Sequence, residues 1–238
     1  MVEKEEQNLT KRFVSIGAEN LLYWSRNVGQ SGEVELIDYI GGDGTVERVA
    51  TAGHGVSIFP ENPEQKDLIN YLTTNGIFQP FKSVQLKFSI QAPIEVALDF
   101  VYDPSVNVNE YSLRYSSALE TNFLPSVGDI ALGLEGKDLK SKAEKIYSIL
   151  SNSRIASFKN YEELININMA RELARTGLGI DQNTRFYWKI DLASLANFVK
   201  RQKSLSYNKC RLSDEYVYAV LQTAAETAPF SWDALMNT

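Results

Sequence analysis

The clearest pattern of apolar and polar positions in this chain lies between residues 84 and 101. Residues 84–92 alternate strictly, with an apolar side chain at each even position and a polar or charged one at each odd position. A period of two is typical of a strand that buries one face. Apolar residues then recur at Ile94, Ala97, Leu98 and Val101, the spacing of a helix that packs one side against a sheet. The sequence therefore predicts a strand followed directly by a buried helix.

A polar loop follows this helix. The pair Asp103-Pro104 ends the helix, because a residue before proline avoids the α region of backbone space. Residues 105–115 read SVNVNEYSLRY and are rich in side chains that form hydrogen bonds. Loops of this kind, held by rigid elements, commonly carry binding residues. The loop is therefore the first candidate for a functional site.

Weaker patterns predict the remaining elements and, together, an α+β fold. A strand is expected at residues 33–39, and helices at residues 62–75, 137–150, 161–176, 191–201 and from 213 onward. Asn62 and Pro63 are the expected start of the first of these helices. Three glycines at residues 41, 42 and 44 favour a plain turn before a short helix capped by Thr45. A phosphate-binding loop is the less favoured alternative, because the glycines lack the spacing of a dinucleotide fingerprint.

Size and composition indicate an ordinary globular protein. Residues 1–31 are predicted to form an N-terminal extension, and residues 32–238 a single domain. The net charge of −6 argues against a general nucleic-acid binder. The single cysteine, Cys210, allows no disulfide within the chain and suits a reducing compartment. The sequence contains no apolar run of membrane-spanning length and no secretory signal at its start, so we expect a cytoplasmic protein without a membrane or nucleic-acid partner.

Four short motifs, taken in order, resemble the flavin-dependent thymidylate synthase (ThyX) family. They are NEYSLRYS at residues 109–116, ARELAR at 170–175, NTRFYW at 183–188 and SLANF at 194–198. The resemblance covers roughly residues 33–235. It implies a central, mostly antiparallel sheet packed with helices, and a homotetramer that binds FAD between subunits. It also implies the family reaction: NADPH reduces the flavin, and methylenetetrahydrofolate supplies the carbon that becomes the methyl group on C5 of dUMP. No enzyme cysteine attacks the pyrimidine in this family.

The family signature is only partly present. It consists of Arg-His-Arg, seven further residues and a serine; Ser112 fills the last position, but residues 102–104 hold Tyr-Asp-Pro in place of the cationic triplet. In the family this triplet holds the flavin and helps to polarise the pyrimidine. We therefore expect a weakened FAD site, with Asp103 placing a negative charge where the family has a positive one. Arg48 and Lys82 are candidates for a compensating cation. No metal site is expected.

Position-by-position matching to the family gives the expected site residues. Arg201 is the candidate catalytic residue, although an ungapped match places the family's catalytic arginine one residue later, at Gln202. Leu113 could contribute only its backbone. The resemblance implies nucleotide contacts from Asp99, Glu110, Ser112, Leu113, Arg114 and Arg175, and flavin contacts from Gln79, Tyr102, Asp103, Glu110, Asp191 and Asn197.

Plainer interpretations of the same residues stay open. Arg171 and Arg175 could form a solvated helix face, and an isolated Arg114 is more often part of a surface salt bridge. Glu110 could cap a backbone N–H group. The aromatic run at residues 186–188 is expected to be core.

Three functions follow from the resemblance and its gaps. The first is a divergent flavin-dependent thymidylate synthase. The second, suggested by the missing triplet, is a non-catalytic nucleotide-binding homologue. The third is an enzyme that alkylates C5 of a different pyrimidine nucleotide, suggested by Asp99 and Tyr102 at positions that face the pyrimidine in the family.

Overall fold

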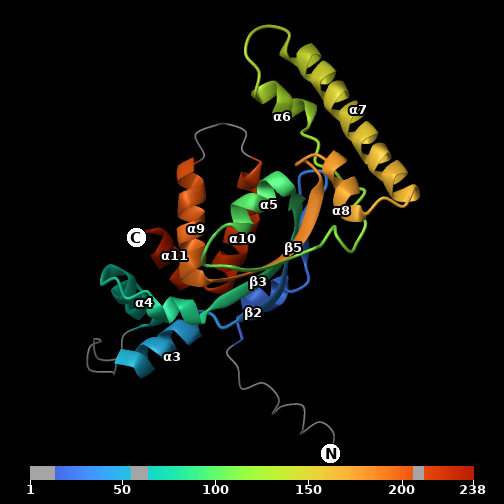
Figure 1. Cartoon of the computed structure of the whole chain (residues 1–238). Coiled ribbons are helices and arrows are strands. Elements are labelled where there is room, and N and C mark those ends of the chain that lie inside the picture. Colours follow the sequence, from blue (N-terminus) through green and yellow to red (C-terminus); the bar gives the residue numbers. More distant parts are fainter. Residues whose placement is uncertain (1–13, 55–63, 206–211) are drawn as a thin grey trace, which may run out of the picture.

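A five-stranded sheet forms the centre of the computed structural model, which describes residues 14–54, 64–205 and 212–238 (Figure 1). Every pair of neighbouring strands is antiparallel, in the order β1-β2-β3-β5-β4. The strands are β1 (Ser25–Val28), β2 (Gly32–Ile40), β3 (Gln85–Pro93), β4 (Asn107–Glu110) and β5 (Asn183–Asp191). This confirms the predicted α+β class with an antiparallel sheet. Cys210 and the expected helix start at Asn62 and Pro63 lie outside the described residues.

Strand β3 is the middle strand and follows the predicted alternation. Leu86, Phe88 and Ile90 are fully buried on one face. On the opposite face Lys87 lies over the ring of Tyr187, which is 47% exposed. Helix α5 (Ile94–Val101) begins directly after β3, as predicted, but its buried residues are Val96, Ala97 and Phe100, and Leu98 of the predicted apolar stripe is 42% exposed.

A cluster of aromatic side chains joins the sheet to the helices on its buried face. Trp188 of β5 contacts the rings of Phe88, Phe100 and Phe198, at centroid distances of 5.9, 5.2 and 5.2 Å. Its indole N–H donates to the carbonyl oxygen of Phe100, at 3.1 Å. Phe100 lies on α5 and Phe198 on α9 (Leu192–Leu205), so both helices pack on the same face of the sheet. The expectation of an aromatic core is confirmed for Phe186 and Trp188, but Tyr187 faces outward.

The predicted helix at residues 161–176 is wrong. Helix α7 (Leu139–Asn166) already contains residues 161–166, and the chain then turns at Asn168, whose φ of 63° is left-handed. Asparagine tolerates that conformation better than most residues, so it ends the helix without a glycine or proline. A separate short helix, α8 (Arg171–Ala174), follows and continues into the 3₁₀ turn η3 (Arg175–Gly177).

Residues 14–31 contribute to the fold. Helix α2 (Ile16–Leu21) precedes β1, and β1 pairs with β2 at the edge of the sheet. Leu21 and Leu22 pack against the core, whereas Tyr23 and Trp24 are exposed. The boundary between an extension at 1–31 and a domain at 32–238 stays a prediction.

A layer of helices packs together next to α9. It comprises α3 (Asp43–His54), α4 (Gln65–Thr74), the 3₁₀ helix η2 (Gln79–Ser83), α10 (Ser213–Thr227) and α11 (Pro229–Met236). Helix α4 ends at Asn75 and Gly76, as predicted. The turn at Gly41 and Gly42 is buried, with Gly42 against the carbonyl oxygen of Thr227, which supports a plain turn. The predicted helix cap at Thr45 is wrong, because α3 already begins at Asp43 and Thr45 lies inside it.

Asp43 fastens α11 to this layer. Its two carboxylate oxygens accept hydrogen bonds from the backbone N–H groups of Phe230 and Ser231, at 3.0 and 2.8 Å. These groups lie in the first turn of α11, where N–H groups lack helical partners and the helix dipole favours a negative charge.

Replacing Asp43 by alanine is expected to lower the free energy of unfolding by about 1–2 kcal/mol, because two N–H groups of α11 lose their acceptors. Urea denaturation followed by circular dichroism measures this change. Asp43→Asn, which keeps one acceptor oxygen, should lose less. Equal stability of the alanine variant and the wild type would contradict this role of Asp43.

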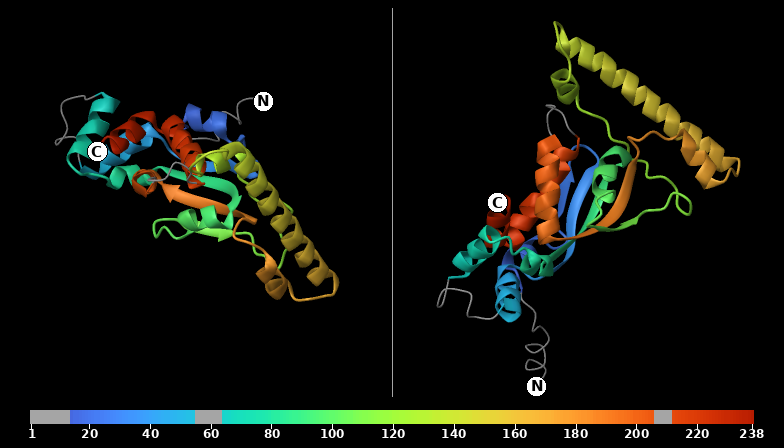
Figure 2. Two further views of the ribbon diagram at one scale, coloured as in Figure 1. Left: turned by 90° about the horizontal axis from the view of Figure 1, so that it is seen from above. Right: turned by 60° about the vertical axis from the view of Figure 1, so that its left-hand side comes forward.

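Helices α6 (Val127–Leu132) and α7 form an arm that projects beyond the sheet (Figures 1 and 2). Helix α7 has 28 residues, and the buried side chains on it are Ala143 and Tyr161. Ile149 and Ile155 are exposed on the same helix. None of the described helices is both long and apolar enough to cross a membrane.

Candidate functional site

The polar loop after β4 is fixed to the sheet by backbone hydrogen bonds. Edge strand β4 pairs with β5, and the N–H group of Tyr111 donates to the carbonyl oxygen of Arg185, at 2.8 Å. The carbonyl oxygen of Ser112 then accepts from the N–H groups of Tyr115 and Ser116, which closes a turn. The hydroxyl of Ser112 accepts from the N–H group of Arg114 at 3.3 Å. The loop therefore holds Ser112 inside the turn and leaves the side chain of Arg114 exposed.

Helix α8 lies beside this loop. Nη2 of Arg114 is 2.9 Å from Oε1 of Glu172, and both side chains are more than half exposed. Glu172 belongs to α8, and Arg175 is the C-cap residue of the same four-residue helix. The contact therefore brings the loop of Ser112 and Arg114 to the helix that carries Arg175. An exposed ion pair of this kind adds little to the stability of the fold. It matters here because it shows that the loop and α8 are neighbours.

Glu110 is tied to β5. The hydroxyl of Thr184 donates to Oε1 of Glu110, at 2.8 Å. Leu113, in the loop, is half-buried. Thr184 was not among the residues that the sequence suggested, because its contact with Glu110 depends on the pairing of β4 with β5.

Asp103 and Arg201 form an ion pair between the end of α5 and α9. The side chain of Asp103 is 2% exposed, whereas that of Arg201 is 55% exposed. Oδ1 of Asp103 also accepts hydrogen bonds from the N–H group and the hydroxyl of Ser105. The cation that compensates Asp103 is thus Arg201, rather than Arg48 or Lys82. Gln202, the residue that an ungapped match favours as catalytic, is buried, with 7% exposure.

The other residues expected at a flavin lie in varied surroundings. Asp191 ends β5, and its carboxylate accepts from the N–H group and the hydroxyl of Ser194, at 2.9 and 2.8 Å, so it caps α9. Gln79 and Tyr102 are exposed, and Asp99 is half-buried on α5. Their contacts with ligands stay predictions.

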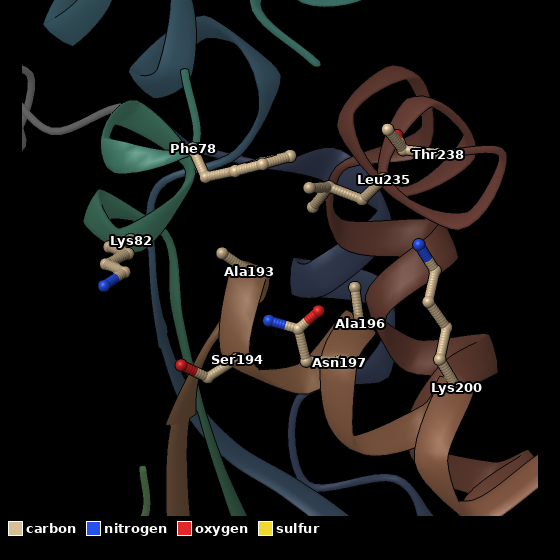
Figure 3. Close-up of a pocket in the computed structure, with 9 residues that line it drawn as sticks. All are labelled: Phe78, Lys82, Ala193, Ser194, Ala196, Asn197, Lys200, Leu235 and Thr238. Atoms are coloured by element: carbon tan, nitrogen blue, oxygen red, sulfur yellow. The ribbon is translucent and has the colours of Figure 1, made fainter. Parts of the chain in front are cut away.

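A cavity of about 380 Å³ lies where α9, η2 and the C-terminal end of the chain meet (Figure 3). In Figure 3 the ring of Phe78 extends toward Leu235, and the amide of Asn197 lies below Ala193, between Ser194 and Ala196. The residues that line the cavity are Phe78, Lys82, Ala193, Ser194, Ala196, Asn197, Lys200, Leu235 and Thr238.

The chemistry of this cavity fits part of a flavin dinucleotide. Apolar walls can hold an aromatic ring, the amide of Asn197 can pair with ring nitrogen or oxygen atoms, and Lys82 and Lys200 are cations at the rim. A second cavity, of about 570 Å³, lies between α7 and residues 120–124. It is larger, but none of the predicted nucleotide or flavin residues lines it.

Comparison with known proteins agrees with these features. The family model described as thymidylate synthase complementing protein matches residues 35–224 of this chain. The flavin-dependent thymidylate synthase of Rickettsia typhi is 32% identical over 248 residues, covering 95% of this chain and 83% of the relative. That of Ehrlichia ruminantium (strain Gardel) is also 32% identical, over 98% of this chain and 80% of the relative.

Solved structures share the fold. The UMP/dUMP methylase PolB from Streptomyces cacaoi, bound with 5-Br UMP, superposes with a TM-score of 0.75 at 20% identity, covering 89% of this chain and 96% of that chain. The same protein bound with 5-Br dUMP gives a TM-score of 0.73 at 22% identity, covering 89% and 97%.

Proposed function

This chain belongs to the thymidylate synthase complementing protein family, and on that premise we propose that it is a flavin-dependent thymidylate synthase, which methylates C5 of dUMP to give dTMP. The observation that supports the proposal is the contact between Arg114 and Glu172, because it links the loop of Ser112 and Arg114 to the short helix that ends at Arg175. The guanidinium groups of two arginines and the hydroxyl of a serine in a turn suit a nucleotide phosphate, because phosphate oxygens accept charge-assisted hydrogen bonds from arginine. Arg175 is half-buried and Arg114 exposed, so ligand atoms can reach both.

Glu110 would complete the nucleotide site. Its anchor on Thr184 fixes one carboxylate oxygen, which leaves the other as an acceptor for the sugar or the pyrimidine N–H group. The backbone of Leu113 lies between the two phosphate-binding side chains of the loop. Asp99 and Tyr102 would face the pyrimidine from the end of α5.

Arg201 would act on the ring. C5 of a pyrimidine is nucleophilic in the polarised form of the ring, in which electron density shifts from N1 toward C5 and the neighbouring carbonyl oxygen before C5 attacks a one-carbon unit. A fixed guanidinium group beside that oxygen lowers the barrier by stabilising the negative charge that this shift places on it. Methylenetetrahydrofolate would supply the carbon, and FAD, reduced by NADPH, would supply the two electrons that convert the transferred methylene group to a methyl group.

The cavity at α9 would hold the flavin ring. Asn197 and the backbone near Ser194 would pair with polar ring atoms, and Phe78 would cover one side. Lys82 and Lys200 would replace part of the positive charge that the chain lacks at residues 102–104. Gln79 lies at the start of η2, next to Phe78.

We further propose that the chain works as a homotetramer in the cytoplasm. The arm formed by α6 and α7 leaves Leu132, Ile149 and Ile155 exposed, and contact with another copy would cover them. Exposed apolar side chains gathered on one projecting element are typical of a protein interface.

The proposal is tested with the purified protein. We expect a flavin absorbance spectrum after incubation with FAD, and oxidation of NADPH that increases when dUMP and methylenetetrahydrofolate are added. Protein that binds dUMP in calorimetry, but neither binds FAD nor oxidises NADPH, would instead be the non-catalytic homologue. Thermal stabilisation by UMP and not by dUMP would favour the enzyme with a changed substrate.

A further inference from the structure

The pair formed by Asp103 and Arg201 is asymmetric. Both oxygens of the Asp103 carboxylate have partners: Oδ1 accepts from the N–H group and the hydroxyl of Ser105, and Oδ2 contacts Nη2 of Arg201. The carboxylate is almost fully buried, but more than half of the arginine side chain is exposed. A buried carboxylate thus holds one nitrogen of a guanidinium group on a side chain that is more than half exposed.

This ion pair is better suited to orienting the guanidinium group of Arg201 than to stabilising the fold. A buried ion pair recovers little more than the cost of taking its charges out of water. An arginine side chain, by contrast, loses much conformational freedom when one end of its planar group is fixed. The remaining N–H groups then point in a set direction, as a group that must meet a transition state requires.

Arg201 is connected along the chain and by contact to both parts of the candidate site. Asn197 and Arg201 are four residues apart on α9, so they lie on one face of the helix, about 6 Å apart along its axis. Asn197 lines the cavity assigned to the flavin. Asp103 is the middle residue of the triplet that lacks positive charge, and the chain after it leads through β4 to the loop of Ser112.

We propose that Asp103 is a positioning residue, which orients Arg201 so that the free edge of its guanidinium group meets the bound pyrimidine. On this view α9 supplies, through Arg201, the cation that residues 102–104 do not provide. The carboxylate at 103 then supports the site instead of opposing it. This inference rests on the proposed function, because it concerns the same nucleotide.

The test is a double-mutant cycle on the full-length protein reconstituted with FAD. The variants are Asp103→Asn, Arg201→Gln and the two combined, with Arg201→Lys as the conservative replacement. Glu226→Gln removes an exposed carboxylate elsewhere and serves as the control. Each variant is measured for thermal unfolding, for the dissociation constant of dUMP by calorimetry, and for kcat and KM.

We expect Asp103→Asn to lower kcat about tenfold, with a smaller change in KM, because the lost interaction acts mainly in the transition state. Calorimetry should show dUMP binding weakened by about threefold or more, which is about 0.65 kcal/mol. In the Arg201→Gln background, Asp103→Asn should cause no further loss in either quantity. Arg201→Lys should recover part of kcat, and recover it only when Asp103 is present.

Two results overturn the proposal. If Asp103→Asn lowers the unfolding temperature but leaves kcat and dUMP binding at the level of Glu226→Gln, the pair is structural. If the two substitutions lower kcat independently, Asp103 does not act through Arg201. In both cases the wild type still binds dUMP and turns over, so the proposed function stands. Wild-type protein that neither binds dUMP nor turns over removes the proposed function, and this inference with it.

Discussion

Replacing Trp188 by alanine is expected to lower the free energy of unfolding by about 3–5 kcal/mol. Trp188 is fully buried and joins β5 to β3, α5 and α9 through its contacts with Phe88, Phe100 and Phe198. Its loss would open a cavity at the junction of sheet and helices and leave the carbonyl oxygen of Phe100 without the indole donor. A change of this size is a large share of the stability of a typical domain.

Urea unfolding, followed by far-ultraviolet circular dichroism, measures this effect. The neighbouring Tyr187→Ala is the matched control: the same strand loses an aromatic ring of similar size, but from the outward face, and we expect about 0.5–1 kcal/mol. Similar losses for the two variants would show that β5 is not oriented as described. A Trp188→Phe variant, which keeps most of the packing, covers the case in which the alanine variant does not fold.

The second large effect is expected at Arg175. Arg175→Gln should raise the dissociation constant of dUMP about 10- to 100-fold, because one charge-assisted hydrogen bond to a phosphate contributes about 1.5–3 kcal/mol. The side chain is half-buried at the end of α8, so its guanidinium group is better fixed than an exposed arginine. Isothermal calorimetry with dUMP and with deoxyuridine separates the phosphate contribution from that of the base and sugar.

Arg171→Gln is the control for this prediction. Arg171 begins the same short helix and is exposed, and its removal changes the net charge by the same amount. We expect its effect on dUMP binding to be less than about threefold, from long-range electrostatics alone. Equal effects of the two substitutions would mean that a solvated helix face, rather than a nucleotide site, is the right interpretation of both arginines.

Local patterns were enough to predict the centre of the fold. The alternation at residues 84–92 and the apolar spacing from Ile94 to Val101 depend on neighbours in the sequence, and both elements form as predicted. The same signal is present in β5, where Phe186, Trp188 and Ile190 are buried and the residues between them are not, although the aromatic run by itself predicted only core residues. Its strand character could have been recognised from the period of two.

The helix boundaries and the site residues could not be predicted from local patterns alone, because they depend on single backbone conformations and on contacts between distant parts of the chain. An apolar spacing that continues through residues 165–173 predicted a single helix, but the left-handed backbone at Asn168 divides it, and asparagine alone is a weak stop signal. Asp103 and Arg201 are 98 residues apart, so their pairing follows from the packing of α5 and α9 on one face of the sheet. Asp191 had a local signal that was missed: an aspartate three residues before Ser194 is typical of a helix N-cap.

The projecting arm has a consequence for how the protein behaves at different concentrations. Helix α7 has few buried side chains, so packing within one chain stabilises it only weakly. In the proposed oligomer, contact with a second copy would bury its exposed apolar residues and stabilise the helix. Association of this kind follows mass action. Specific activity and melting temperature should therefore both fall when the protein is diluted, and the two decreases should have the same midpoint in protein concentration.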